Sequence, residues 1–278
     1  MADFVVQAPA VAPAVIAKLA RQAGAQAIVP VGTGAPAAWR FPEVAVNDAL
    51  VDAARAAGCD AAYVPADRRL GNVGVVAMDM DSTLITIECI DEIADMKGIK
   101  PEVAAITASA MRGEIDFAQS LEQRVALLAG LPVEALERVY AERLRISDGA
   151  TRMLAGFKAA GATTALVSGG FTFFTDRLKA ALPFDVAVAN ALGVEGGRLT
   201  GRVEGTLVDG RVKADTLHAL AKQRGRGIAV AIGDGANDLP MFAAADVAIA
   251  WRAKPVVRAQ AACALDFCGL DGALNFFR

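Results

Sequence analysis

Histidines and paired cysteines are scarce in this sequence. His218 is the single histidine, which excludes a zinc site built from several histidines and argues against a phosphohistidine mechanism. The four cysteines are scattered, without a CxxC pair, which is typical of reduced thiols in the cytoplasm. The net charge is −3, and no long cluster of Lys and Arg is present on which a phosphate backbone could rest. We therefore do not expect a nucleic-acid partner.

Targeting and membrane signals are also lacking. The N-terminal residues show no basic leader followed by a hydrophobic run, so no signal peptide is predicted. A charge-free stretch, Gln22 to Trp39, is interrupted by prolines and glycines and indicates a helix end, a strand and a loop. From these absences we expect a cytoplasmic protein with no membrane partner.

The chain has 278 residues, 55% of them hydrophobic, enough for one large domain or two smaller ones. Residues 1–70 predict a small α+β unit in the order strand, helix, strand, strand, helix, strand. No catalytic constellation is visible in this unit, so we expect a regulatory or interaction domain. Whether it senses an amino acid or pairs subunits into a homodimer is left open.

The rest of the chain predicts an α/β fold. Residues 71–84 and 147–278 alternate strands with helices, a pattern typical of a doubly wound parallel sheet covered on both faces. Residues 85–146 predict four helices with no strand between them. A helical block inserted directly after the first strand indicates a cap over the end of that strand.

The first strand of this core, Val73 to Met78, ends in Asp79-Met80-Asp81. Side chains alternate along a strand, so Asp79 and Asp81 can share a face and repel each other unless a cation binds. Alone, this pattern is most simply a strand that ends in a polar turn, with Ser82 capping a helix.

Two later strands also end in chemically useful groups. One is followed by Ser168-Gly169-Gly170 and the other by Gly233 to Asp238, and both turns lead into helices whose N–H groups can face an anion. Lys213 could add a positive charge there. The hard carboxylate oxygens of Asp79, Asp81 and Asp234 would suit Mg²⁺ shared with a phosphate.

These motifs resemble those of the haloacid dehalogenase-like phosphatases, and within them the phosphoserine phosphatase family. The matching segments are Asp79–Thr83, Met111–Val125, Ser168–Phe174 and Gly233–Met241, together with Glu88 and Lys213. The resemblance covers about residues 73–260, and residues 1–70 resemble the ACT-like regulatory extension of some members. At Ile146-Ser147-Asp148-Gly149 this chain lacks the proline that many members carry before the glycine, which bears on the stiffness of the hinge.

The resemblance implies roles for the residues at the strand ends. Asp79 would be the nucleophile that forms an aspartyl-phosphate. Asp81 would act as general acid and then base, and its main-chain carbonyl would join Asp79 and Asp234 in binding Mg²⁺. Substrate phosphate would be held by Ser168, Gly169, Lys213 and Asn237. Asp238 would orient Lys213 or a metal-bound water.

The resemblance also implies how the cap selects O-phospho-L-serine, the substrate of the last step of serine biosynthesis. Glu88 would bind the ammonium group, and Arg124 would bind the carboxylate in a bidentate manner. Met111 and Phe117 would close the pocket and exclude water. Without the motifs, Glu88 and Arg124 would be ordinary solvated helix charges and the two apolar residues ordinary cap core. The alternative function is phosphatase or phosphotransferase activity on another small phosphomonoester.

Overall fold

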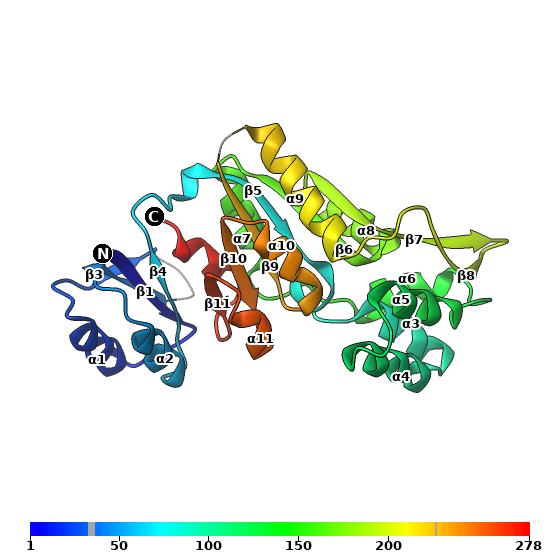
Figure 1. The fold of residues 1–278 in the computed structure, drawn as a ribbon, viewed down its shortest axis with the longest axis horizontal. Coiled ribbons are helices and arrows are strands. Elements are labelled where there is room, and N and C mark those ends of the chain that lie inside the picture. Colours follow the sequence, from blue (N-terminus) through cyan, green and yellow to red (C-terminus); the bar gives the residue numbers. More distant parts are fainter. Residues whose placement is uncertain (33–36, 226) are drawn as a thin grey trace.

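The computed structural model describes residues 1–32, 37–225 and 227–278, and its larger part is a seven-stranded sheet (Figure 1). The strand order is β11-β10-β9-β5-β6-β7-β8, and all neighbouring pairs are parallel except β7 with β8. The strands are β5 (Val73–Met78), β6 (Thr163–Phe171), β7 (Val186–Glu195), β8 (Arg198–Glu204), β9 (Ile228–Gly233), β10 (Val247–Trp251) and β11 (Cys263–Leu265). β5 is central, and the chain builds outward from it on both sides. The carboxyl end of β5 is therefore the switch point at which such sheets bind ligands.

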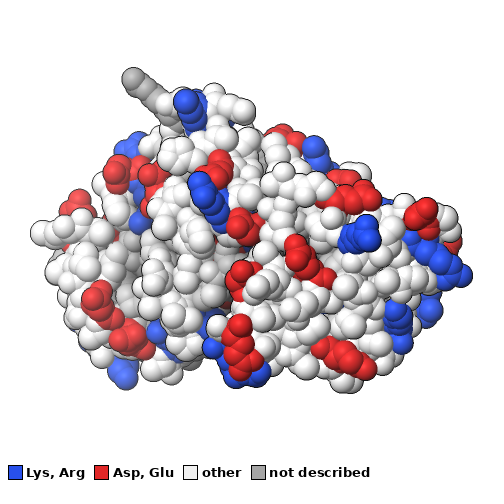
Figure 2. Space-filling model, turned by 45° about the vertical axis from the view of Figure 1, so that its right-hand side comes forward, with Lys and Arg blue, Asp and Glu red and all other residues white. Residues whose placement is uncertain are grey.

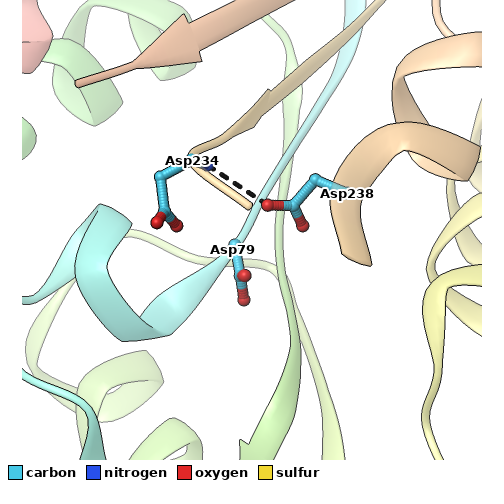
Figure 3. Close-up of side chains that lie close together, drawn as sticks. All are labelled: Asp79, Asp234 and Asp238. Atoms are coloured by element: carbon cyan, nitrogen blue, oxygen red, sulfur yellow. Dashed lines mark hydrogen bonds between the residues drawn. The ribbon is translucent and has the colours of Figure 1, made fainter. Parts of the chain in front are cut away.

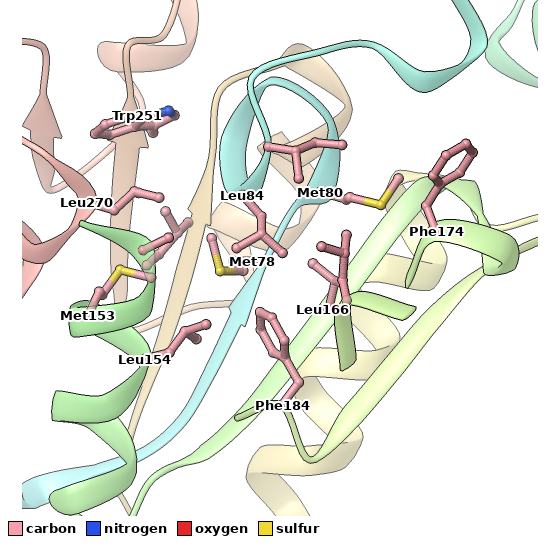
Figure 4. Packing of buried hydrophobic residues seen from close by; sticks show 14 of the residues in the cluster. Met78, Met80, Leu84, Met153, Leu154, Leu166, Phe174, Phe184, Trp251 and Leu270 are labelled. Atoms are coloured by element: carbon pink, nitrogen blue, oxygen red, sulfur yellow. The ribbon is translucent and has the colours of Figure 1, made fainter. Parts of the chain in front are cut away.

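Side chains along β5 alternate between the two faces of the sheet. Val76 and Met78 join one apolar cluster with α7 and α8, whereas Val75 and Ala77 join another with α9 and α10. Figure 4 shows the first cluster around Met78. The covering helices are α7 (Ala150–Ala159), α8 (Thr172–Ala181), α9 (Gly210–Arg224), α10 (Leu239–Ala243) and α11 (Pro255–Arg258). The predicted doubly wound parallel sheet is thus confirmed, because both faces are buried under helices.

The helical cap lies between β5 and β6 in the chain. It contains α3 (Cys89–Lys97), α4 (Lys100–Met111), α5 (Phe117–Ala126), α6 (Glu134–Arg138) and a further helical turn, Val139–Arg143. The two connections to the core run side by side, because Ile85 and Ile146 form an antiparallel bridge. α5 begins at a capping box in which the Asp116 carboxylate accepts a hydrogen bond from the Gln119 amide.

The N-terminal unit is a four-stranded antiparallel sheet of order β2-β3-β1-β4 with two helices. Its elements are β1 (Ala2–Ala8), α1 (Pro13–Ala23), β2 (Val29–Val31), β3 (Ala37–Val44), α2 (Asp48–Ala56) and β4 (Asp60–Val64). The predicted order of strands and helices is confirmed. The second helix starts only at Asp48, because Val44 still pairs with Ala2 in the sheet and Asn47 caps the helix.

The C-terminal segment, residues 263–278, joins the two sheets, a contact that the sequence did not predict. β11 is the edge strand of the large sheet, and a 3₁₀ segment, Leu270–Phe276, follows it. The Gln7 side chain donates to the Gly272 carbonyl oxygen at 3.0 Å. This segment therefore fastens the N-terminal unit to the core.

Two features bear on the partners considered above: the mix of charges on the surface and the length of the apolar helices. On the face drawn in Figure 2, Lys and Arg side chains are interspersed with Asp and Glu. Among the described ranges of the chain, no helix is both long enough and apolar enough to cross a membrane.

Candidate active site

Asp79 lies directly after the central strand. Its main-chain N–H donates to the Ile232 carbonyl oxygen at 3.0 Å, which continues the pairing of β5 with β9 and keeps the backbone extended. Asp79 Oδ2 lies 2.7 Å from Lys213 Nζ and accepts a hydrogen bond of 3.2 Å from Asn237 Nδ2. The Asp79 carboxylate is thereby fixed at the switch point, with little freedom to rotate.

Two further carboxylates stand beside it, as Figure 3 shows. Asp79, Asp234 and Asp238 each offer an oxygen, and these oxygens lie within 4.8 Å of one another. Asp234 accepts a hydrogen bond of 2.9 Å from the Thr83 hydroxyl, and Asp238 accepts the amide N–H of Asp234 at 3.2 Å. Two turns of the sheet, the one after β5 and the one after β9, therefore bring three acidic groups to one point.

Lys213 is the buried cation of this group. It lies in the first turn of α9, which begins at Gly210 because the Asp209 side chain caps the helix. Lys213 Nζ is 2.8 Å from Asp238 Oδ1 as well as 2.7 Å from Asp79, and its side chain is 1% exposed. Burial lowers its pKa, but the two carboxylates outweigh that effect and raise it, so the lysine is charged.

One lysine does not neutralise three carboxylates. Burial, together with the charge of Asp79, raises the pKa of Asp234 to about 6 and also raises that of Asp238. Such crowding favours a bound cation, and a set of carboxylate oxygens suits a hard ion such as Mg²⁺. The cluster of Asp79, Asp234 and Asp238 therefore fits a hard cation such as the one that the sequence predicted.

The structure separates Asp81 from this group. Asp81 Oδ1 accepts the amide N–H of Cys89 at 3.0 Å, and a β-carbon placed on Gly170 would lie 2.6 Å from Asp81 Oδ2. Ser82 has a φ of +54°, a left-handed conformation that turns the chain here. The three carboxylates brought together are thus those of Asp79, Asp234 and Asp238, and the Asp81 side chain is left free of this cluster.

The surroundings of Asp81 suit proton transfer. Burial and the charge of Asp79 raise the pKa of Asp81. A carboxyl group whose pKa is raised toward neutrality can hold a proton and release it to a leaving group.

The C-terminal part of β6, from Ser168 to Phe171, lies beside the turn that follows Asp79, and its pairing with β7 is irregular. The buried Ser168 hydroxyl accepts the Gly170 amide N–H at 2.9 Å. Asn190, which the sequence analysis missed, donates through Nδ2 to the Gly169 carbonyl oxygen at 2.8 Å. Asn190 Oδ1 also accepts the Val208 amide N–H at 2.8 Å. This buried side chain therefore links the C-terminal part of β6 to the loop between β8 and α9. No sequence motif marks Asn190, whereas Thr83 is the last residue of the first motif, Asp79–Thr83.

The predicted cap residues approach the same edge to different degrees. A β-carbon on Gly169 would lie 3.0 Å from Phe117 Cζ, so Phe117 approaches the C-terminal part of β6 closely. The Glu88 carboxylate accepts a hydrogen bond from the Ser82 hydroxyl, and Glu88 is exposed to solvent. Met111 is 68% exposed.

The charges of Glu88 and Arg124 act on the same region. Protein atoms around Glu88 and the charge of Asp81 raise the pKa of Glu88. Burial lowers the pKa of Arg124, and the carboxylates of Asp91, Glu88 and Asp81 partly counter that effect. An acidic and a basic group thus stand on the cap side of Asp79, as a zwitterionic ligand would require.

Comparison with known proteins agrees with this geometry. The family model for haloacid dehalogenase-like hydrolases matches residues 76–243. Phosphoserine phosphatase of a Polaromonas species is 49% identical over 76% of this chain and 93% of its own length. Phosphoserine phosphatase of Haemophilus influenzae is 45% identical over 77% of this chain and 69% of its own.

Two solved structures are similar in fold. The unliganded probable phosphoserine phosphatase of Vibrio cholerae superposes with a TM-score of 0.87 at 38% identity, over 99% of this chain and 86% of that one. A substrate-bound phosphoserine phosphatase complex gives 0.69 at 38% identity, over 74% of this chain and 99% of that one. From the motifs, the site and these matches, the chain belongs to the haloacid dehalogenase-like hydrolases and, among them, to the phosphoserine phosphatase family.

Proposed function

We propose that this chain hydrolyses O-phospho-L-serine to L-serine and phosphate in the presence of Mg²⁺, as the last step of serine biosynthesis. The observation that carries the proposal is the position of Asp79 at the switch point. It is held by Lys213 and Asn237 beside Asp234, and it faces a cap that supplies Glu88 and Arg124.

Asp79 is the nucleophile. Its carboxylate oxygen forms a bond to the phosphorus atom while the bond from phosphorus to the serine oxygen breaks, and Asp81 gives its proton to that oxygen. Water then attacks the phosphorus of the aspartyl-phosphate, Asp81 takes the proton of the water, and phosphate leaves as Asp79 is restored. The raised pKa of Asp81 supports this exchange of a proton.

Phosphate approaches this edge of the sheet only if the local negative charge is offset. Lys213 offsets part of it, and Asp79, Asp234 and the main-chain carbonyl of Asp81 would hold a Mg²⁺ ion, which would supply further positive charge. Asp238 keeps Lys213 in place, because Asp238 Oδ1 accepts a hydrogen bond of 2.8 Å from the Lys213 ammonium.

The cap gives the reaction its substrate. Glu88 binds the ammonium of phosphoserine, and Arg124 binds its carboxylate through the planar guanidinium. Phe117, which contacts the loop that holds phosphate through Ser168 and Gly169, excludes water from the pocket, and Met111 completes its closure.

Residues 1–70 remain outside this chemistry. Their role as a regulatory or interaction domain, pairing into a homodimer, and a cytoplasmic location all stay predictions from the sequence.

The proposal is tested by phosphate release from a panel of phosphomonoesters, with and without Mg²⁺. O-phosphoethanolamine is the informative comparison, because it keeps the ammonium of phosphoserine and lacks the carboxylate. We expect Arg124→Ala to lower kcat/KM for phosphoserine about 30- to 100-fold, the loss of a charge-assisted pair, and to change the value for phosphoethanolamine little.

Arg112→Ala is the matched control, since Arg112 pairs with Glu114 on the exposed cap surface. Equal losses on both substrates would show that the assigned carboxylate pocket is wrong. Faster hydrolysis of another ester than of phosphoserine would favour the alternative of a different small phosphomonoester substrate.

A further inference from the structure

The β7–β8 hairpin forms one edge of the core sheet but also contacts the cap in space (Figure 1). The Gly130 amide donates to the Leu199 carbonyl oxygen at 2.8 Å, and the Leu199 amide donates to the Leu131 carbonyl oxygen at 2.8 Å. The Val133 amide donates to the Gly197 carbonyl oxygen at 3.0 Å. We call this pairing of residues 130–133 with residues 197–199 the clasp.

Side chains reinforce the clasp. Leu199 is 2% exposed and belongs to the same apolar cluster as the cap residues Leu128 and Leu131. Arg198 Nη1 donates to the Gly130 carbonyl oxygen at 2.8 Å. The hairpin is thus attached to the cap by both main-chain hydrogen bonds and buried apolar surface.

Gly201 marks the closest approach of the hairpin to α5. A β-carbon at this position would lie 2.8 Å from the Ala129 β-carbon and 3.1 Å from the carbonyl oxygen of Ala126, the last residue of α5. Gly205, in the same hairpin, has almost the same left-handed φ, +77° against +78°, and nothing within 4 Å. At Gly201 a side chain would both strain the backbone and collide with the cap. At Gly205 a side chain would strain the backbone only.

α5 is the helix that carries Phe117 and Arg124. Its N-terminal end meets the core where Phe117 contacts Gly169, and its C-terminal end meets the hairpin at Gly201. Both ends of α5 are thus fixed against segments that follow the cap in the chain. Elsewhere the cap meets the core through the pair of connections at Ile85 and Ile146 and through the ion pair of Glu137 with Arg177 of α8.

We propose that the β7–β8 hairpin is a working part of the cap: the clasp stays closed during turnover and positions α5 so that Arg124 meets the substrate carboxylate. In this respect the inference rests on the proposed function. Gly201 and Arg198 are positioning residues, because they act on the substrate through α5 and do not touch it.

The first test compares Gly201→Ala with Gly205→Ala. Both variants strain a left-handed backbone, but only Gly201→Ala pushes the hairpin away from α5. We expect Gly201→Ala to raise KM for phosphoserine about fivefold to tenfold at nearly constant kcat, the pattern of lost substrate binding, and to leave kinetics with phosphoethanolamine close to those of Gly205→Ala. Identical kinetics of the two variants on phosphoserine would overturn the proposal.

The second test locks the clasp. Pro132 and Arg198 face each other in an antiparallel bridge, flanked by the hydrogen bonds of their neighbours, which is the closely spaced kind of pair that a disulfide can span. The native cysteines are all buried, so a Pro132→Cys, Arg198→Cys double variant offers one accessible pair.

If the hairpin moves with the cap, the oxidised double variant keeps at least half of the turnover rate of its reduced form. If the cap must leave the hairpin to admit substrate, oxidation abolishes turnover and a reductant restores it, which would overturn the proposal. Because p-nitrophenyl phosphate can report turnover in this test, a wild-type chain inactive on phosphoserine would refute the proposed function without deciding the role of the clasp.

Discussion

Carboxylates are buried at two places in this protein, and their surroundings differ. At the carboxyl edge of the large sheet, Asp79, Asp234 and Asp238 crowd together around Lys213. At the junction with the N-terminal unit, Asp3 and Asp60 are about as buried as Asp79 and Asp238, but they lie among hydrogen-bond donors. The comparison separates buried acids that hold the fold together from acids that await a ligand.

The junction satisfies its acids. The Asp60 carboxylate accepts the main-chain N–H groups of residues 266–268 at 2.7 to 3.2 Å, although burial still raises its pKa. Asp3 lies 3.1 Å from Arg40 and 2.6 Å from Arg278. Burial raises the pKa of Asp3, but hydrogen bonds from the Glu43 amide and the two arginines outweigh it and lower the pKa.

The catalytic edge leaves its acids in mutual repulsion. Burial and the charge of Asp79 raise the pKa values of Asp234 and Asp238, and Lys213 alone offsets part of this effect. The arrangement is stable enough to fold because Thr83, Asn237 and main-chain amides hold the carboxylates. Crowded charge that the protein does not neutralise therefore marks the functional site better than burial alone.

The largest expected effect is on catalysis. Asp79→Asn removes the nucleophile but keeps the shape of the side chain, so we expect turnover of phosphoserine to fall about a thousandfold or more while the protein still unfolds cooperatively. Phosphate release and thermal unfolding measure the two quantities. Asp215→Asn, on the exposed part of α9, is the control and keeps wild-type turnover. Substantial turnover by Asp79→Asn would remove Asp79 from the role of nucleophile.

The reverse pattern is expected at the junction. Asp60→Asn places an amide NH₂ where three main-chain N–H groups now find acceptors, so the free energy of unfolding should fall by about 2 to 3 kcal/mol. The folded fraction should keep nearly wild-type kcat, because Asp60 is remote from the catalytic carboxylates in the fold. Chemical denaturation and steady-state kinetics test this. A large loss of kcat without loss of stability would erase the distinction between the two places.

A smaller, pH-dependent effect is expected at Asp3. Since folding lowers its pKa from the ordinary 3.8, its ionised form contributes stability above that value, and this contribution is lost as the pH falls through the folded-state pKa. Asp3→Asn should therefore cost about 1 kcal/mol at pH 7 and progressively less as the pH falls below 3.8 and through the folded-state pKa of Asp3. The exposed Asp52→Asn serves as control, and an unchanged difference at low pH would contradict the ion-pair explanation.

The sequence predicted most of the catalytic edge because its residues are local to strand ends. The apolar run before Asp79 predicted β5 with the bounds that the structure has, and strand alternation explains its two buried faces. Parallel strands then bring motifs at Ser168 and Asp234 to the same edge, whatever the separation in the chain.

What the sequence could not predict depends on contacts between distant segments. The grouping of Asp238 with Asp79 and Asp234 depends on how the turn after β9 folds back toward β5. The hydrogen bonds of Asn190 depend on Gly169 and Val208, which are distant in sequence, lying near it. The clasp joins residues far apart in sequence through main-chain atoms, which leave no side-chain pattern. The C-terminal segment likewise gains its role only when the N-terminal unit packs on it.

The central claim is that Asp79 carries phosphate during turnover. The most direct measurement is mass analysis of peptides from the wild-type protein, quenched in acid during turnover of O-phospho-L-serine with Mg²⁺. We expect a phosphate adduct on the peptide that contains Asp79, absent without substrate and absent in Asp79→Asn. Rapid phosphate release with no adduct on that peptide, or with the adduct on another residue, would contradict the account.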